Sequence, residues 1–133
     1  MRPSPDSTRA MVGGVTLALA LIGAPGALRA QDAVKAAPNN FTVLLENERV
    51  RVLEFHTAAG QKIPMHSHPA YISYSISGSG KTKFTAPDGK VTEQTAKTGQ
   101  ATWHEADTHA SEYIGAGSAR VLLVELKPSA AGK

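Results

Sequence analysis

Short runs of alternating apolar and polar residues dominate the chain after residue 40, and glycine or proline separates one run from the next. FTVLLE and RVRVLEF, residues 41–46 and 49–55, flank a turn, and YISYSIS at residues 71–77 is followed by a glycine-rich turn. A period of two residues is the pattern of β-strands, because successive side chains point to opposite faces. No ten-residue window in this region carries the apolar period of a helix. Strands spaced by roughly 8 to 12 residues predict an all-β sandwich or barrel.

The first 30 residues have the layout of a secretory signal peptide. Arg2 and Arg9 precede an apolar run over residues 11–22, and small residues lead to Ala30. The run is shorter than the about 20 residues that a spanning helix needs, so a cleaved export signal is favoured over a membrane anchor. We expect cleavage before Gln31, a periplasmic or secreted protein, and no stable membrane insertion after cleavage.

Loss of this segment lowers the formal net charge from +3 to +1, because it holds three arginines and one aspartate. Lys81 and Lys83 form a close basic pair but no basic stripe, so no nucleic-acid partner is expected. The chain has no cysteine, which excludes disulfides. We expect a flexible leader over residues 31–40, one domain over 41–127 and a disordered tail over 128–133. A domain this small needs packing, a metal ion or self-association for stability.

Two histidines stand one residue apart in QKIPMHSH, residues 61–68. His66 and His68 share one face of a strand, because residues i and i+2 point the same way. Imidazole nitrogen suits zinc, copper, iron and nickel, and such a site needs a third ligand from elsewhere in the chain. An isolated His-x-His is more often a solvent-facing strand segment. A second region with histidines, TGQATWHEADTHASEY at residues 98–113, shifts the balance towards a metal site.

The two regions together resemble the motifs of small single-domain proteins of the cupin superfamily. The first cupin motif is a glycine, five residues and His-x-His, and here five residues separate Gly60 from His66. The second motif begins with a glycine and carries a third histidine, which Gly99 and His109 match. The resemblance covers most of residues 41–127. It implies a cupin jelly-roll barrel, a double-stranded β-helix, in which the three histidines converge on a divalent transition metal.

The chain departs from the cupin pattern where the first motif carries a glutamate. That place falls within residues 71–73, which offer no carboxylate. The predicted metal ligands are therefore His66, His68 and His109 alone, and they leave the ion an open or water-filled position. An open position is the condition for catalysis rather than for a closed structural site. Zinc, iron(II) or copper(II) fits three imidazoles, whereas magnesium and calcium fit poorly.

The function predicted from these residues is an exported, metal-dependent enzyme that acts on a small molecule, with Tyr71 or Glu105 as proton donor or acceptor. The resemblance permits oxygenases, isomerases and lyases and does not choose among them. The alternative is a binding module that holds a small molecule or a metal without turnover. A third interpretation is a barrel that serves self-association through edge strands such as FTVLLE, which leaves a homodimer open.

Several residues near the predicted site have two interpretations. Glu105 and Asp107 precede the third histidine, and they are either loop carboxylates in solvent or groups that fold over the barrel mouth. Trp103 is predicted to lie in the core, with His104 on the opposite face of its strand. In residues 71–77 one face is rich in serine and the other is apolar. Either face is compatible with an inward orientation, because a preceding proline can introduce a bulge.

Overall fold

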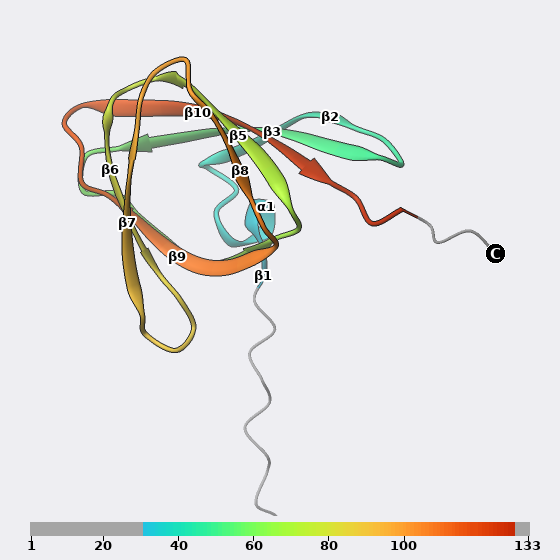
Figure 1. Ribbon diagram of the computed structural model, residues 1–133, viewed down its shortest axis with the longest axis horizontal. Helices are drawn as coiled ribbons and strands as arrows, with labels where there is room; N and C mark the ends of the chain where they lie inside the picture. The colour runs from blue at the N-terminus through green and yellow to red at the C-terminus, as the bar shows by residue number, and fades with distance from the viewer. Residues whose placement is uncertain (1–30, 130–133) are drawn as a thin grey trace, which may run out of the picture.

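Two five-stranded sheets make up the fold of residues 31–129, the part of the chain that the computed structural model describes (Figure 1). The sheet that carries the paired histidines, here called the histidine sheet, has the order β1 (Gln31–Asp32), β4 (Lys62–His68), β9 (Asp107–Tyr113), β6 (Gly80–Thr85), β7 (Val91–Ala96). The facing sheet has the order β2 (Phe41–Glu46), β3 (Val50–Ala58), β10 (Ser118–Leu126), β5 (Tyr71–Ser77), β8 (Ala101–His104). The all-β prediction is confirmed.

The strands pair in the antiparallel manner, except that β1 runs parallel to β4. Neighbours in each sheet come from distant parts of the sequence: β10 lies between β3 and β5, and β9 lies between β4 and β6. FTVLLE forms the edge strand β2, as predicted. In the described range no helix is long and apolar enough to span a bilayer. The predicted signal peptide, residues 1–30, and residues 130–133 of the predicted tail lie outside the described range.

Residues 31–40 are not the flexible leader that we expected from the sequence. They form β1, which adds a parallel strand beside β4, and the four-residue helix α1 (Ala33–Ala36). The Asp32 side chain caps α1 by accepting a hydrogen bond from the Val34 amide at 3.1 Å. Ala33 and Ala37 are buried in the core. The prediction failed because small alanine side chains give no alternating pattern, although they favour a helix and fit where larger side chains do not.

The core lies between the two sheets and is closed on one side by α1. Leu53 on β3 and Leu123 on β10 are directly paired and both buried. Phe41, Ile63 and Tyr71 complete the buried cluster together with the alanines of the α1 segment. Burial of each large apolar side chain contributes about 2 kcal/mol. This cluster fixes the spacing between the sheets, and it therefore positions the inward side chains beside it.

The serine-rich face of β5 is the inner one. Tyr71 and Ser75 are buried, whereas Ile72 and Tyr74 are 38% and 44% exposed. Trp103 pairs with Ile72 across β8 and β5, so it lies on the outer face and is 51% exposed. The prediction that Trp103 lies in the core is therefore wrong. Alternate residues of the edge strand β8 point to opposite faces, and Thr102 and His104 are the ones that face the interior.

Candidate metal centre

The three histidines singled out by the sequence come together on the inner face of the histidine sheet. His66 and His68 lie on β4, and a register shift after Ile63 places His66 directly opposite His109 on β9. All three are at most 5% exposed. One nitrogen from each ring lies within 4.8 Å of the corresponding nitrogens of the other two. The local cause is strand parity, which aims alternate residues of β4 and the opposing residue of β9 at the same point.

Each of the three rings has its Nδ1 bonded to an acceptor behind it. Nδ1 donates at 2.7 Å in each case: from His66 to the Pro64 carbonyl, from His68 to Glu125 Oε1, and from His109 to Asp107 Oδ2. A carbonyl and an ionised carboxylate only accept, so Nδ1 carries the proton in each ring. The lone pair of Nε2 then faces the common centre. This is the tautomer that metal-ligating histidines adopt when an outer acceptor orients them.

The environment of His66 and His109 favours the neutral imidazole, which is the form that binds a metal. Burial, and then the neighbouring His68 and His109, lower the pKa of His66 to about 4. Burial also lowers the pKa of His109, even though its hydrogen bond to Asp107 acts in the opposite direction. These two rings are therefore held in the form that ligates a metal at neutral pH.

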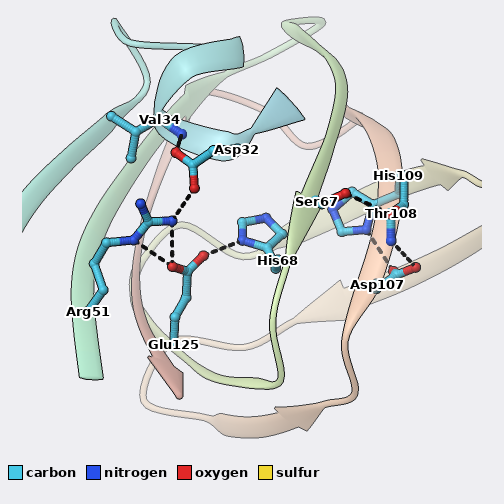
Figure 2. Close-up of polar contacts among 9 residues, drawn as sticks. All are labelled: Asp32, Val34, Arg51, Ser67, His68, Asp107, Thr108, His109 and Glu125. Carbon is cyan, nitrogen blue, oxygen red and sulfur yellow. Dashed lines mark hydrogen bonds and ion pairs between the residues drawn. The ribbon is translucent and has the colours of Figure 1, made fainter. Parts of the chain in front are cut away.

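Charged residues from three other elements stand behind His68, as Figure 2 shows. Glu125 on β10 is 1% exposed and accepts a hydrogen bond from Arg51 Nε at 2.7 Å. Arg51 in turn contacts Asp32 at 2.5 Å. Sequence reasoning missed Glu125. Its position in the sequence could have revealed it. Val121, Leu123 and Glu125 share one face of β10, and a buried carboxylate on a face that is otherwise apolar needs a polar partner.

The two acidic residues that the sequence placed before the third histidine have different positions. Asp107 begins β9, and its carboxylate accepts a hydrogen bond from His109 Nδ1, which orients that ring (Figure 2). Partial burial opposes ionisation of Asp107, but its hydrogen bonds to His109 and to the Thr108 amide hold its pKa below the usual value. Glu105 is exposed and accepts a hydrogen bond from Trp103 Nε1 at 2.7 Å. Glu105 does not line the cavity beside the histidines.

A cavity of about 130 Å³ lies between the sheets with the three histidines in its wall. Its apolar wall comes from Phe41, Phe55, Phe84, Val121 and Leu123, and its polar wall from hydroxyl and amide side chains such as Ser73, Thr82, Gln94 and Ser111. Among the described residues, no lysine, arginine or carboxylate lines this cavity. A ligand inside it therefore meets apolar surface, neutral hydrogen-bonding groups and the histidine centre.

Tyr71 lies in the cavity wall beside the three histidines. Its ring centroid is 4.8 Å from that of His68, and it stacks on His104 at 4.4 Å. Burial raises the pKa of Tyr71, and so do the nearby charges of Asp107 and Glu125. Its hydroxyl is therefore a neutral hydrogen-bond donor. His104, which the sequence left as an outer or surface residue, also lines the cavity, and its Nε2 shares a 2.8 Å hydrogen bond with Ser73 Oγ.

Solved structures similar in fold to this chain include a cupin domain and a double-stranded β-helix domain. A cupin domain from Bordetella pertussis Tohama I has a TM-score of 0.60 and 22% identity, covering 66% of this chain and 92% of that one. A conserved protein with a double-stranded β-helix domain from Klebsiella pneumoniae has a TM-score of 0.52 and 23% identity, covering 78% and 93%. The DMSP lyase DddQ from Ruegeria pomeroyi has a TM-score of 0.51 and 13% identity, covering 72% and 51%.

No family model matches the sequence, and no curated protein matches it either. At identities of 13% to 23%, the similarity to the solved structures supports a shared fold but not a shared function. The three structures share with this chain the two-sheet architecture that the cupin-like motifs implied. The described residues of this protein therefore have the cupin fold, a double-stranded β-helix.

Proposed function

We propose that this protein binds a divalent transition metal through His66, His68 and His109 and acts on a small molecule held in the adjoining cavity. The observation that carries the proposal is the set of three Nδ1 hydrogen bonds, which present three Nε2 lone pairs to one point. A pocket that needed only polar side chains has no reason to orient all three rings alike. An ion held by neutral imidazoles supplies, when bound, a Lewis acid that polarises an oxygen of the substrate.

The donor set favours zinc, iron(II) or copper(II), because imidazole suits these ions better than the oxygen-seeking magnesium and calcium. Tyr71 is the proposed proton donor, since its neutral hydroxyl-bearing ring lies against His68. Glu105 is left out of the proposed acid–base chemistry, because its carboxylate accepts from Trp103 and does not line the cavity. The reaction class stays open among oxygenase, isomerase and lyase chemistry, since a shared fold does not fix it.

The cavity limits the substrate. Its volume of about 130 Å³ is close to the ~150 Å³ of an engineered cavity that holds benzene. No cationic side chain in its described lining neutralises an anionic group. We therefore propose a compact, largely apolar substrate whose one strongly polar group, an oxygen donor, faces the histidine centre while the rest contacts Phe41, Phe55 and Phe84.

The test is the metal content of untagged protein recovered from its native compartment. The wild type is expected to carry about one transition-metal ion per chain, and the triple variant His66→Ala, His68→Ala, His109→Ala is expected to carry none. The matched control is His56→Ala, because His56 is exposed and contacts Glu54 on the outer side of β3. A wild type without metal, or a triple variant that retains it, would refute the site.

A binding module without turnover is the second candidate, favoured by the apolar wall that closes around a ligand. Tyr71→Phe distinguishes the two. If the protein is an enzyme, this variant keeps its metal but loses turnover on a panel of small oxygen-bearing substrates by about 100-fold, the usual size of a proton-transfer contribution. If the protein is a binder, ligand affinity is all that can change. Glu105→Gln serves as the exposed control, with no expected effect on metal content or turnover.

We also propose that the protein is exported and periplasmic or secreted, with residues 1–30 removed as a signal peptide. The support is the sequence pattern: two arginines, an apolar run over residues 11–22 and small residues that lead to Ala30. The same preparation used for metal analysis tests this, because its N-terminal sequence is expected to begin at Gln31. An intact N-terminus on protein from that compartment would contradict it.

A second copy of the chain is the proposed protein partner. On the outside of the facing sheet, side chains that are direct neighbours across five strands form an outer apolar row: Leu45, Val52, Val124, Ile72 and Trp103. The ion pairs Glu54–Arg120 and Glu46–Lys127 lie on the same sheet. A surface with an apolar row and nearby charges of both signs is complementary to a copy of itself, as a two-fold interface requires.

A further inference from the structure

A buried chain of charged groups ends on one of the three imidazoles. Both carboxylate oxygens of Glu125 are engaged: Oε1 accepts from His68 Nδ1 and Oε2 accepts from Arg51 Nε, each at 2.7 Å. Arg51 Nη2 also contacts Asp32 at 2.5 Å. Figure 2 shows these side chains as a continuous line from the start of α1 to His68. We call Asp32, Arg51 and Glu125 the charged triad.

Packing alone does not account for a carboxylate at this position. Glu125 is 1% exposed, and the inward residues before it on β10 are Val121 and Leu123. Taking charges out of water is costly, and apolar residues of similar volume often replace a buried ion pair with no loss of stability. A leucine at position 125 would continue the apolar face of β10. It would leave His68 Nδ1 without the acceptor that fixes its tautomer.

The formal charges around the histidine centre form a balanced set. Two carboxylates and one guanidinium give the charged triad one net negative charge. Burial opposes ionisation of Asp32, but its hydrogen bond to Arg51 and the Arg51 charge hold its pKa below the usual value. Asp107, behind His109, supplies a second negative charge. With three neutral imidazoles, the outer carboxylates thus offer two negative charges, which match one divalent cation.

We propose that the charged triad positions His68 and provides half of the charge that balances the bound ion. It takes the place of the carboxylate ligand that the histidine set lacks, but acts one layer further out. The inference rests on the proposed metal site. It also gives the segment of β1 and α1 a role in that site, since Asp32 contacts Arg51, which contacts Glu125.

Two variants remove charge while they preserve shape. Glu125→Gln keeps a side-chain oxygen of the same length to accept from His68 Nδ1. Asp32→Asn keeps the cap of α1, because asparagine caps a helix as well as aspartate does. Zinc affinity measured by competition with a chelator is expected to fall by about 10- to 100-fold in Glu125→Gln, the usual effect of mutating an outer partner of a ligating histidine. In Asp32→Asn, which is one step more distant, we expect a smaller loss.

The matched control is Glu112→Gln. Glu112 lies on β9 three residues after His109, and its carboxylate pairs with Lys83 at 2.8 Å on the outer face. This variant makes the same substitution at a glutamate that points away from the histidines, and its zinc affinity is expected to equal that of the wild type. Thermal unfolding of the metal-free proteins checks that every variant folds. The absorption spectrum of the cobalt(II)-loaded protein reports ligand geometry, and it is expected to change in Glu125→Gln but not in Glu112→Gln.

The outcomes separate the two proposals. A wild type that binds no zinc refutes the metal site itself. A wild type that binds zinc, with unchanged affinity in both Glu125→Gln and Asp32→Asn, refutes the role of the charged triad and leaves the metal site standing. Equal losses in Glu125→Gln and Glu112→Gln also refute it, because they reduce the effect to general charge. If Glu125→Gln does not fold, Asp32→Asn alone decides, since its cap and packing are retained.

Discussion

The imidazole of His66 links the stability of the barrel to pH even without a metal. Burial and the neighbouring imidazoles lower its pKa to about 4 in the folded protein, whereas an unfolded chain protonates histidine near pH ~6.5. Between these values the unfolded state binds more protons, so stability falls as the pH falls. His66 contributes at most about 3 kcal/mol to this loss. Urea unfolding of the metal-free protein at about pH 7 and about pH 4.5 measures the change.

The control for this prediction is His66→Gln, which replaces the titrating ring with a neutral polar side chain. Its free energy of unfolding is expected to depend less steeply on pH over the same window. His109 also has a lowered pKa, so part of the slope remains. The same slope in His66→Gln and in the wild type would contradict the assignment of a buried, neutral His66.

The sequence predicted the three clustered histidines and missed Glu125, the carboxylate that orients His68. His66 and His68 were found because strand parity requires only local spacing, and His109 was found through the cupin-like second motif. Glu125 was missed because its partner lies 57 positions away, and alternation reveals which face a residue takes but not what it meets there. Asp107 was singled out as a carboxylate near the site. Its role in orienting His109 depends on a side-chain direction that the pattern does not contain.

The turn between β5 and β6 is an element boundary where substitution of a glycine meets the backbone of another strand. Gly78 has φ +84, and a Cβ there would lie 2.6 Å from the Ser118 carbonyl oxygen. Gly89 has nearly the same φ, +85, but nothing lies within 4 Å of its Cβ position. Gly89→Ala is therefore expected to cost about 1 kcal/mol for backbone conformation alone. Gly78→Ala is expected to cost more, about 3 kcal/mol, because the backbone of β10 must also shift.

Chemical denaturation of both glycine variants measures this difference. The pair isolates steric crowding, because the two substitutions share the strain of a positive φ and differ in what surrounds the new methyl group. Equal costs would mean that the contact between the β5–β6 turn and the start of β10 is loose. In that case the packing of β5 on β10, which carries Tyr71 and Glu125, would be less fixed than the structure indicates.

Strands and turns were largely predictable from the sequence, whereas the element that closes the core was not. The alternating runs and their glycine boundaries correspond to strands β2 to β10. A half-buried strand has one apolar and one polar face, so its residues alternate in the sequence. The segment of β1 and α1 has no such pattern, because two strand residues and one helical turn are too short to show a period. The prediction that Trp103 is buried failed for a related reason. A large aromatic side chain is usually buried, but the strand register decides which face of the sheet it points to.

For the whole molecule, the absence of cysteine and the small size of the domain make its remaining sources of stability important. The buried cluster around Leu53 occupies one part of the space between the sheets, and the cavity with its histidines occupies another. A bound ion adds stability that grows with the logarithm of its affinity, because it binds only the folded state. Self-association is the other source, and it needs a surface that a monomer leaves uncovered.

The outer apolar row predicts a dimer. Leu45, Ile72 and Trp103 are 49%, 38% and 51% exposed, and they are joined across the sheet by the half-buried Val52 and Val124. Soluble monomers rarely leave a continuous apolar strip of this kind in water. Light scattering coupled to size-exclusion chromatography is therefore expected to give twice the chain mass for the wild type. The double variant Ile72→Lys, Trp103→Lys is expected to give a monomer.

Val91→Lys is the matched control for this last prediction, because Val91 is 52% exposed but lies on β7 of the other sheet. It is expected to stay dimeric. A wild type that runs as a monomer at micromolar concentration would contradict the dimer, and equal dissociation in Val91→Lys would show that added charge rather than the row is responsible. Metal content measured on the monomeric double variant adds a final distinction. All three histidines come from one chain and face its interior, so the isolated subunit is expected to keep its metal.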